Sequence, residues 1–264
     1  GALSFNVTGG FSLSAGGSLN DDDGTNNIVA WCWDAGSSTV TNTDGSIDSQ
    51  VRANTTAGIS VATWTAGSSM GTAGHGLGVA PQVCIRKVRG LATDWIVHHN
   101  LVDGSHDYMR LNNTNTNSGT SVQLPTSSVM GTDDNNGLEF VVYSFSQVEG
   151  FSKFGKYIGN GESGTDGTFL YLGFRPAFVL IKRTDVAENW WLYDIKRDPY
   201  NQMTQILYGD LNNVEISATG NNISNEFHSN GIKFVTSNVN WNANGGTYVY
   251  FAFAESPFKN ARAR

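Results

Sequence analysis

Residues 76–89 read GLGVAPQVCIRKVR and residues 172–184 read LGFRPAFVLIKRT, and these two stretches decide the fold. In each stretch a proline, Pro81 or Pro176, follows a glycine by three positions and precedes a tryptophan by fourteen. The two prolines lie 95 positions apart, and so do the two tryptophans. A fixed spacing of this kind is the signature of an internal repeat. The rest of the chain can therefore be aligned outward from these stretches.

The parts that flank the two stretches also recur in the same order. Each copy has an aromatic-rich strand, a glycine-rich turn, the proline strand, a polar turn, a tryptophan strand, a variable middle and a closing aromatic strand. This order predicts two full repeats, at residues 53–150 and 151–264. Residues 1–52 are expected to be the tail end of a truncated upstream repeat plus a linker. The linker is polar and punctuated by glycines, and it covers residues 34–58, so it runs a few positions into the first full repeat.

The closing strands carry large residues at every second position, which places them on one face because side chains alternate along a strand. We expect this face to be core, and the smaller residues opposite to let another layer or subunit approach. The equivalent triplets are Val29, Trp31 and Trp33; Val141, Tyr143 and Phe145; and Val249, Phe251 and Phe253.

Upstream of the closing strand, residues 9–26 and 229–247 share a glycine that enters a strand and an Asn/Gly-rich connection to the next strand. These features predict hairpins. Helical periodicity is nearly absent; one short turn is predicted at 198–207, with Asp198 as its N-cap and Pro199 at the first helical position. The predicted fold class is all-β, with tandem antiparallel β-sandwich repeats of jelly-roll type and little helix.

Composition narrows the function. The chain has 264 residues and a net charge of −7, which disfavours a nucleic-acid partner because the phosphate backbone demands a positive surface. The sequence has no apolar run of transmembrane length, so membrane insertion is not expected. Cys32 and Cys84 belong to no CxxC pair and are expected to be free, buried thiols.

The repeat resembles the repeat-built virion proteins of tailed, often marine, bacteriophages. The resemblance covers nearly the whole chain and rests on the two proline stretches, on 189–201 (NWWLYDIKRDPYN), on 229–234 (SNGIKF) and on the ending YVYFAFAESPFKNARAR. It implies the C-terminal part of a tail fibre, spike or appendage, located on the outside of the virion. No catalytic or binding residue follows from it.

Residues that differ between the copies are the best candidates for a working surface. Trp191, Tyr193, Asp194 and Arg197 have diverged from the residues at 96–102, where a scaffold alone would not require change. Aromatic rings stack on sugar faces while carboxylates and amides bind hydroxyls, so the sequence predicts glycan binding. The candidate residues are Trp191, Tyr193, Asp194, Arg197, Tyr200, Trp64 and Trp241.

Other motifs favour structural roles. Lys87 and Lys182 recur at equivalent places and are expected to reach the sheet edge or protect it. Trp95 and Trp190 are expected to fill space between sheets. The loops at 20–27 and 132–137 are expected to be solvated hairpin tips, because they lack the spacing of a calcium loop.

Metal binding and catalysis are not predicted. His98 and His99 are adjacent, so a strand would point them to opposite faces, and with His106 they match no tetrahedral zinc pattern. The available carboxylates fall mostly in predicted loops, without the buried pair that glycoside hydrolysis needs. We therefore expect neither cofactor nor metal and no enzymatic activity.

The sequence predicts a structural virion module that adheres to host-surface glycans. Its expected partners are further copies of itself, with a trimer favoured, other virion proteins and a host cell-surface polysaccharide. The alternative is a decoration, head-fibre or tail-connector protein whose repeats serve assembly only.

Overall fold

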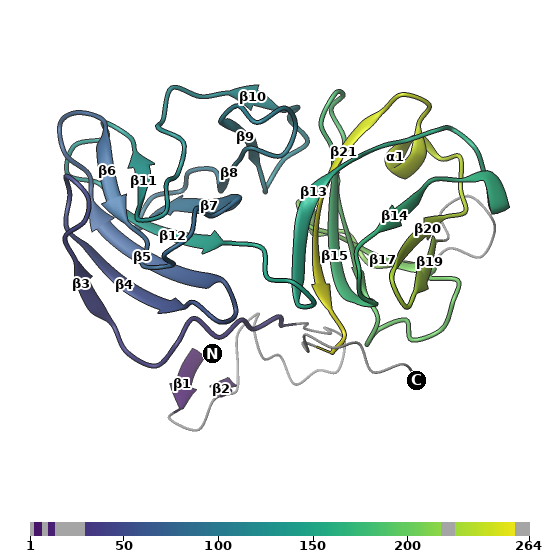
Figure 1. Ribbon diagram of the computed structural model, residues 1–264, viewed down its shortest axis with the longest axis horizontal. Coiled ribbons are helices and arrows are strands. Elements are labelled where there is room, and N and C mark those ends of the chain that lie inside the picture. The colour runs from purple at the N-terminus through teal and green to yellow at the C-terminus, as the bar shows by residue number, and fades with distance from the viewer. Residues whose placement is uncertain (1–2, 7–9, 14–29, 218–224, 257–264) are drawn as a thin grey trace. The chain divides into compact units, whose positions relative to one another are not determined.

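A computed structural model describes residues 3–6, 10–13, 30–217 and 225–256 of the chain (Figure 1). The chain divides into two compact units, Gly1–Trp33 and Asp34–Arg264, and each is described by itself.

The described residues of the first unit include an antiparallel hairpin, formed by β1 (Leu3–Asn6) and β2 (Gly10–Leu13). Leu3 lies opposite Leu13, and Asn6 lies opposite Gly10. β2 confirms the strand predicted after the glycine at 10. The third closing strand is not confirmed: its described part, residues 30–33, has no strand, and Val29 lies outside the described residues.

The second unit begins with a sandwich of two antiparallel sheets. Its large sheet has the strand order β10-β9-β8-β7-β12-β5-β4-β3, and β11 and β6 form the small sheet. The strands are β3 (Val40–Asn42), β4 (Ser49–Asn54), β5 (Ile59–Thr65), β6 (Gly71–Gly74), β7 (Val83–Val88), β8 (Ile96–His99), β9 (Asp107–Arg110), β10 (Ser118–Gly119), β11 (Val129–Thr132) and β12 (Glu139–Phe145).

A second sandwich follows in the same unit. Its large sheet has the order β13-β21-β15-β16-β17-β18, and its small sheet has the order β14-β20-β19. The strands are β13 (Ser152–Ile158), β14 (Phe169–Tyr171), β15 (Pro176–Arg183), β16 (Trp190–Asp194), β17 (Gln205–Tyr208), β18 (Ile216–Ser217), β19 (Asn225–His228), β20 (Gly231–Phe234) and β21 (Thr247–Ala254). A 3₁₀ turn, η1 (Gly164–Asp166), precedes β14, and a single helical turn, α1 (Val239–Asn242), precedes β21.

The two sandwiches share both strand order and register. The order β5-β12-β7-β8-β9-β10 in the first matches β13-β21-β15-β16-β17-β18 in the second. Lys87 lies opposite Val141 on the closing strand, and Lys182 lies opposite Val249. Because a slip of one residue would turn every side chain to the other face, this matching register is a strict test of the alignment. The all-β fold of tandem antiparallel sandwiches is confirmed.

Two local predictions are wrong. The expected linker at 34–58 contains β3 and β4, which extend the first large sheet, and β4 crosses the predicted boundary between residues 52 and 53. Val51 on β4 is 1% exposed, so burial of this one apolar side chain outweighs the polar composition around it. No helix forms at 198–207; the Asp198 carboxylate instead accepts a hydrogen bond from Gln205 N (2.9 Å), where β17 begins.

The assignment of the core face is right in that Val249, Phe251 and Phe253 are buried, but it is wrong about which face lies between the two layers. The side chains between the two layers are those of the opposite face, Phe140 and Val142 on β12 and Tyr248, Tyr250 and Ala252 on β21. The small residues at these positions therefore lie inside the sandwiches and offer no surface to another subunit.

The face predicted to be core is buried between the two sandwiches instead of between the two sheets of one sandwich. Phe145 of the first sandwich contacts Phe154 and Phe253 of the second, with ring centroids 6.2 and 6.1 Å apart. Phe251 and Phe253 are accordingly buried, whereas Tyr143 is half-buried. Both faces of β21 are apolar because one faces its own small sheet and the other the neighbouring sandwich.

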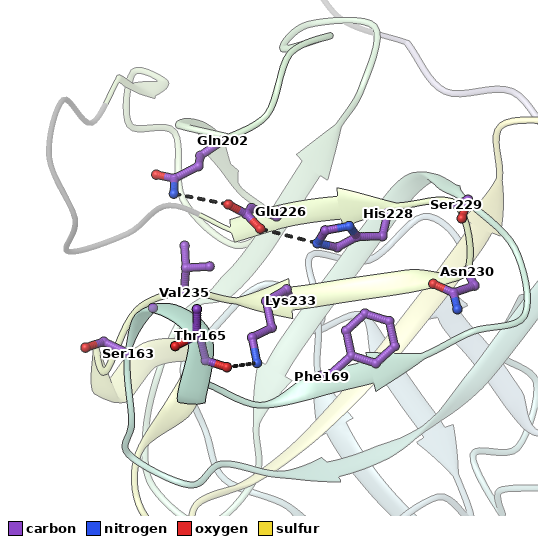
Figure 2. Close-up of a pocket in the computed structure, with 11 residues that line it drawn as sticks. Ser163, Thr165, Phe169, Gln202, Glu226, His228, Ser229, Asn230, Lys233 and Val235 are labelled. Atoms are coloured by element: carbon purple, nitrogen blue, oxygen red, sulfur yellow. Dashed lines mark hydrogen bonds and ion pairs between the residues drawn. The ribbon is translucent and has the colours of Figure 1, made fainter. Parts of the chain in front are cut away.

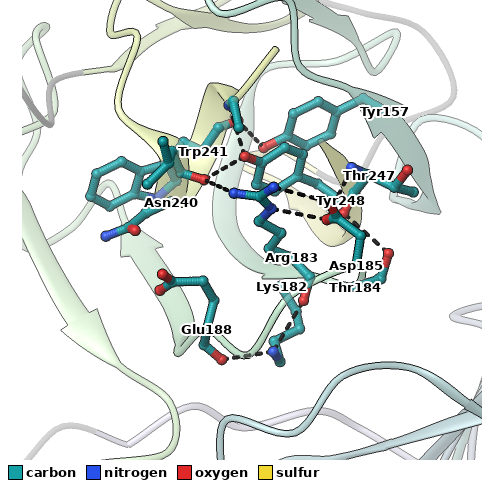
Figure 3. A network of polar contacts seen from close by, with 12 residues as sticks. Tyr157, Lys182, Arg183, Thr184, Asp185, Glu188, Asn240, Trp241, Thr247 and Tyr248 are labelled. Carbon is teal, nitrogen blue, oxygen red and sulfur yellow. Dashed lines mark hydrogen bonds and ion pairs between the residues drawn. The ribbon is translucent and has the colours of Figure 1, made fainter. Parts of the chain in front are cut away.

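The two recurring lysines bind backbone carbonyls at the turn that follows their strand. Lys87 Nζ donates to the carbonyls of Val88 (2.8 Å) and Leu91 (2.5 Å). Lys182 Nζ donates to those of Arg183 (3.0 Å) and Glu188 (2.7 Å), as Figure 3 shows. Since β7 and β15 are interior strands, the prediction that these lysines reach or protect a sheet edge is wrong. The recurring role is to satisfy the carbonyls of a tight turn.

Lys182 also joins the two sandwiches. Its Nζ lies 3.2 Å from Thr114 O of the first sandwich, and Glu188 N donates to the same carbonyl (3.1 Å). Close by, Trp190 Nε1 donates to Arg110 O (2.7 Å). Trp190 thus fills space toward the first sandwich, not between its own two sheets. Direct bonds to backbone atoms hold this junction in one geometry.

The buried Lys182 makes the stability of the junction depend on pH. Burial lowers the pKa of Lys182 to about 8, against the opposing effect of Asp210, Glu188 and Asp185. Because the folded-state pKa lies below the unfolded value of 10.5, the unfolded chain binds the proton more tightly between these pH values. The buried charge therefore costs stability below pH 8, and this cost disappears as the pH rises.

We expect Lys182→Met to change how stability depends on pH. Between pH 8 and 9.5 the free energy of unfolding of the wild type should rise relative to that of the variant, by at most about 1.4 kcal/mol per pH unit. Urea titrations across this range measure the difference. Lys87→Met, which removes the half-exposed counterpart, controls for the loss of turn contacts alone. A constant difference between wild type and Lys182→Met would contradict the prediction.

Candidate functional site

Four of the seven predicted glycan-binding residues are buried in the sandwich cores. Trp64 is 5% exposed in the first sandwich, and Trp191, Tyr193 and Trp241 are 3%, 0% and 0% exposed in the second. The rings of Trp191 and Trp241 pack against each other at 4.8 Å between centroids. Rings enclosed in this way cannot stack on a sugar, so these four residues are corrected to core.

The other three predicted residues lie outside the core but form no shared site. Arg197 makes a two-pronged ion pair with Glu215, with both N–O distances at 2.8 Å. The Asp194 carboxylate accepts a hydrogen bond from Lys196 N (2.9 Å). Tyr200 is 80% exposed. The first two are therefore occupied by local contacts, and the third is an exposed ring.

Alternation along β16 explains why the prediction failed. Trp191 and Tyr193 are on the face that packs under the small sheet, and Trp190 is on the face toward the first sandwich. The divergence between Trp191 and its counterpart Ile96 reflects a larger core in the second sandwich.

The second sandwich has an open hollow of about 680 Å³ on the outer side of its small sheet. Figure 2 shows it between β19, β20, β14 and the turn at η1. Its principal side chains are Phe169, Gln202, Glu226, His228, Asn230 and Lys233. Phe169 is 43% exposed, which leaves an aromatic surface available to a ligand.

The β19–β20 hairpin positions the polar side chains of the hollow. Phe227 and Ile232, directly opposite each other, point into the core. The alternate residues, Glu226 and Lys233, are also opposite each other and point outward into the hollow (Figure 2). The apolar–polar alternation of these strands thus fixes which groups a ligand can meet.

Polar contacts hold these side chains in place. The Glu226 carboxylate accepts a hydrogen bond from Gln202 Nε2 (3.3 Å) and lies 3.3 Å from His228 Nε2. Lys233 Nζ donates to Thr165 O (2.8 Å) and to Gly167 O, which ties the hairpin to the turn at η1. Glu226 is the only carboxylate among the lining residues, whereas glycoside hydrolysis uses two.

The hollow depends on a strand that the first sandwich does not share. The small sheet of the first sandwich has only β6 and β11, and residues 120–128, which precede β11 and are all described, form no strand. β19, which carries Glu226 and His228, is therefore specific to the second sandwich. The comparison of copies could have revealed this difference, because the second copy has the extra alternating segment NEFH at 225–228.

The remaining predicted features lie elsewhere in the structure. Among the described residues, no group of three His, Cys, Asp or Glu side chains is arranged to hold a metal ion. In the loop at 132–137, Asp133 pairs with the buried Arg86 at 2.8 Å and is not merely solvated. The loop at 20–27 lies outside the described residues. Cys84 is buried as predicted, but Cys32 is exposed.

The fold and the hollow define an all-β protein of two sandwiches with one open, polar and aromatic surface site. The chain belongs to the family described as Domain of unknown function (DUF7483), which matches residues 2–257. No curated protein and no solved structure matches the chain. Within the described part of the chain, no helix is long and apolar enough to cross a membrane.

Proposed function

We propose that this chain is a non-catalytic structural module of a bacteriophage virion, the C-terminal part of a fibre or spike, which adheres to glycans of the host surface. The virion assignment rests on the resemblance of the repeat motifs. In the proposal the module lies on the particle exterior as a homo-oligomer, with a trimer favoured, in contact with other virion proteins.

The observation that carries the adhesive role is the hollow on β19–β20. An exposed ring beside fixed carboxylate, amide and ammonium groups is the combination that binds a sugar, because the ring covers the C–H face and the polar groups take the hydroxyls. A shallow site of this kind gains strength by repetition in an oligomer.

The charged side chains of the hollow favour a neutral sugar. Two carbonyls already take two of the three donors of Lys233, whereas Gln202 and His228 leave about half of the acceptor sites of the Glu226 carboxylate open. A carboxylate accepts hydrogen bonds from hydroxyl groups and repels carboxylated sugars. The proposed ligand is therefore a neutral, hydroxyl-rich saccharide.

The test is binding of the purified chain to a glycan array and to host cells. Phe169→Ala should weaken binding about tenfold, since an aromatic contact contributes up to about 1.5 kcal/mol. Glu226→Gln keeps the shape but loses the charge, so it should weaken binding and relax the exclusion of acidic sugars. Tyr200→Ala is the matched control, because it removes an exposed ring that does not line the hollow.

The outcomes separate the parts of the proposal. Wild-type binding that Phe169→Ala leaves unchanged would reject the site but keep adhesion. Preference for acidic sugars would reject the sugar class. No binding above background would reject adhesion itself.

The second candidate is a decoration, head-fibre or connector protein that serves assembly only. This assembly role is favoured because most of the rings expected to bind sugar are buried and structural: Trp64, Trp191, Tyr193 and Trp241. A density map of the whole particle discriminates the two: an exposed β19–β20 hairpin supports adhesion, and a hairpin covered by neighbouring proteins supports assembly.

A further inference from the structure

The first sandwich contains a small cavity that plays no part in the proposed glycan binding. The cavity has a volume of about 10 Å³. Its walls include Trp64, Arg86, His98, His106 and Met130, from β5, β7, β8, the segment before β9, and β11. A cavity of roughly 10–15 Å³ accommodates one water molecule.

Several buried polar atoms of the residues that line this cavity have no hydrogen-bonding partner in the protein. They are both ring nitrogens of His98, Nε2 of His106 and Nε1 of Trp64. His98 is 5% exposed, so bulk solvent does not serve these atoms. A buried polar group without a partner costs about 1–3 kcal/mol, and natural structures seldom tolerate several together.

The hydrogen-bonding capacity of these atoms is complementary to water. His106 Nδ1 lies 2.7 Å from Val122 O, which can only accept, so Nδ1 carries the proton and Nε2 is an acceptor. Trp64 Nε1 can only donate, and a neutral His98 offers one donor and one acceptor. A water molecule can donate to His106 and accept from Trp64 or His98, which gives it the two to four partners that buried waters have.

The surroundings disfavour a metal ion. The Arg86 guanidinium forms part of the wall and repels a cation. Burial raises the pKa of the Cys84 thiol to about 11, so this soft ligand stays protonated. An anion is disfavoured too: burial keeps the histidines neutral, and Asp133 already pairs with the Arg86 guanidinium (2.8 Å).

We infer that the first sandwich binds one internal water molecule, held between His106 Nε2, His98 and Trp64 Nε1. This water satisfies the orphaned nitrogens and links β8 to the core beneath the small sheet.

A crystal structure of the chain at atomic resolution tests the inference directly. The expected result is one density peak at roughly 2.7–3.2 Å from at least two of the named nitrogens. A peak at about 2.0–2.3 Å from Cys84 Sγ or a histidine nitrogen would identify a metal ion and overturn the inference. Clear density for the side chains with no peak between them would overturn it as well.

Oxygen-17 relaxation dispersion in solution gives an independent count of long-lived internal waters. His98→Phe should lower this count by one. His75→Phe is the matched control: His75 is fully buried too, but Thr126 O lies 3.1 Å from its Nε2 and Leu77 N donates to its Nδ1 (3.2 Å). An equal count in the wild type and His98→Phe would contradict the inference.

Discussion

Lowering the pH from 7 to 4 is expected to destabilise the first sandwich by about 3 kcal/mol through His99 alone, and by more through the other histidines. Four of the five histidines of the chain belong to this sandwich: His75, His98 and His99 are buried, and His106 is half-buried. Burial lowers the pKa of His99 to about 4 and that of His98 well below its ordinary value of 6.5. It also lowers the pKa values of His75 and His106.

The direction of the effect follows from proton uptake. A histidine whose folded-state pKa lies below 6.5 binds fewer protons in the folded chain than in the unfolded chain between those two pH values. The free energy of unfolding therefore falls as the pH drops below 6.5 and levels off below the folded-state pKa. Asp210 in the second sandwich, whose pKa burial raises, works in the opposite direction but is a single group. Typical domain stabilities are only about 5–15 kcal/mol, so the first sandwich should unfold in mild acid.

Urea unfolding at a series of pH values, followed by tryptophan fluorescence, measures this loss. His98→Leu should reduce the slope of stability against pH between 6.5 and 4. His228→Gln, which removes the exposed histidine of the second sandwich, should leave it unchanged. Stability that stays constant between pH 6.5 and 4.5 would show that these histidines are not buried in the neutral form.

Asn242→Ala is expected to lower the free energy of unfolding of the second sandwich by about 4 kcal/mol. Asn242 is 0% exposed and forms the centre of a polar network. Its Oδ1 accepts from Asn160 N (3.0 Å) and Thr168 Oγ1 (2.8 Å). Its Nδ2 donates to Asn160 Oδ1 (2.9 Å), Glu162 O (2.8 Å) and Thr236 O (3.1 Å).

The size of the effect comes from the partners that the substitution leaves behind. Alanine would remove five hydrogen bonds to three segments, each worth about 0.5–1.5 kcal/mol, and would leave the carbonyl of the buried Thr236 without this donor. The residues around Glu162 also form the wall of the hollow at Ser163, Gly164 and Thr165, so ligand binding should weaken too.

Chemical denaturation of the variants checks this second prediction. Asn242→Asp should be at least as harmful, because a carboxylate cannot donate to the carbonyls of Glu162 and Thr236. Asn244→Ala, at an exposed position two residues later, is the control and should change stability little. A loss below about 1 kcal/mol for Asn242→Ala would mean that water replaces the lost bonds at low cost.

The sequence predicts those features of the fold that repetition enforces. The spacing of Pro81 and Pro176 gives the equivalence of β7 and β15, and the alignment of closing strands matches the register that places Lys87 and Lys182 opposite equivalent valines. Alternation shows that β21 has two distinct faces. It does not show which face meets the small sheet, because both are apolar when a second sandwich packs on one of them.

The candidate site was harder to predict for a related reason. An aromatic residue such as Trp191 has the same identity whether it fills a core or meets a ligand, and only its surroundings distinguish the two. β4 was missed because a single buried residue, Val51, anchors a strand of otherwise polar composition. The hollow was missed because it lies on an extra strand, β19, and the alignment emphasised what the copies share.

In the proposed site, the register of the β19–β20 hairpin puts the side chains that would meet a ligand on one face and the core side chains on the other. Its outward positions 226, 228 and 233 can exchange residues without disturbing Phe227 and Ile232 beneath them. The β1–β2 hairpin has the same four-pair register. In the proposed site, a different ligand would therefore require different surface residues but no change of fold.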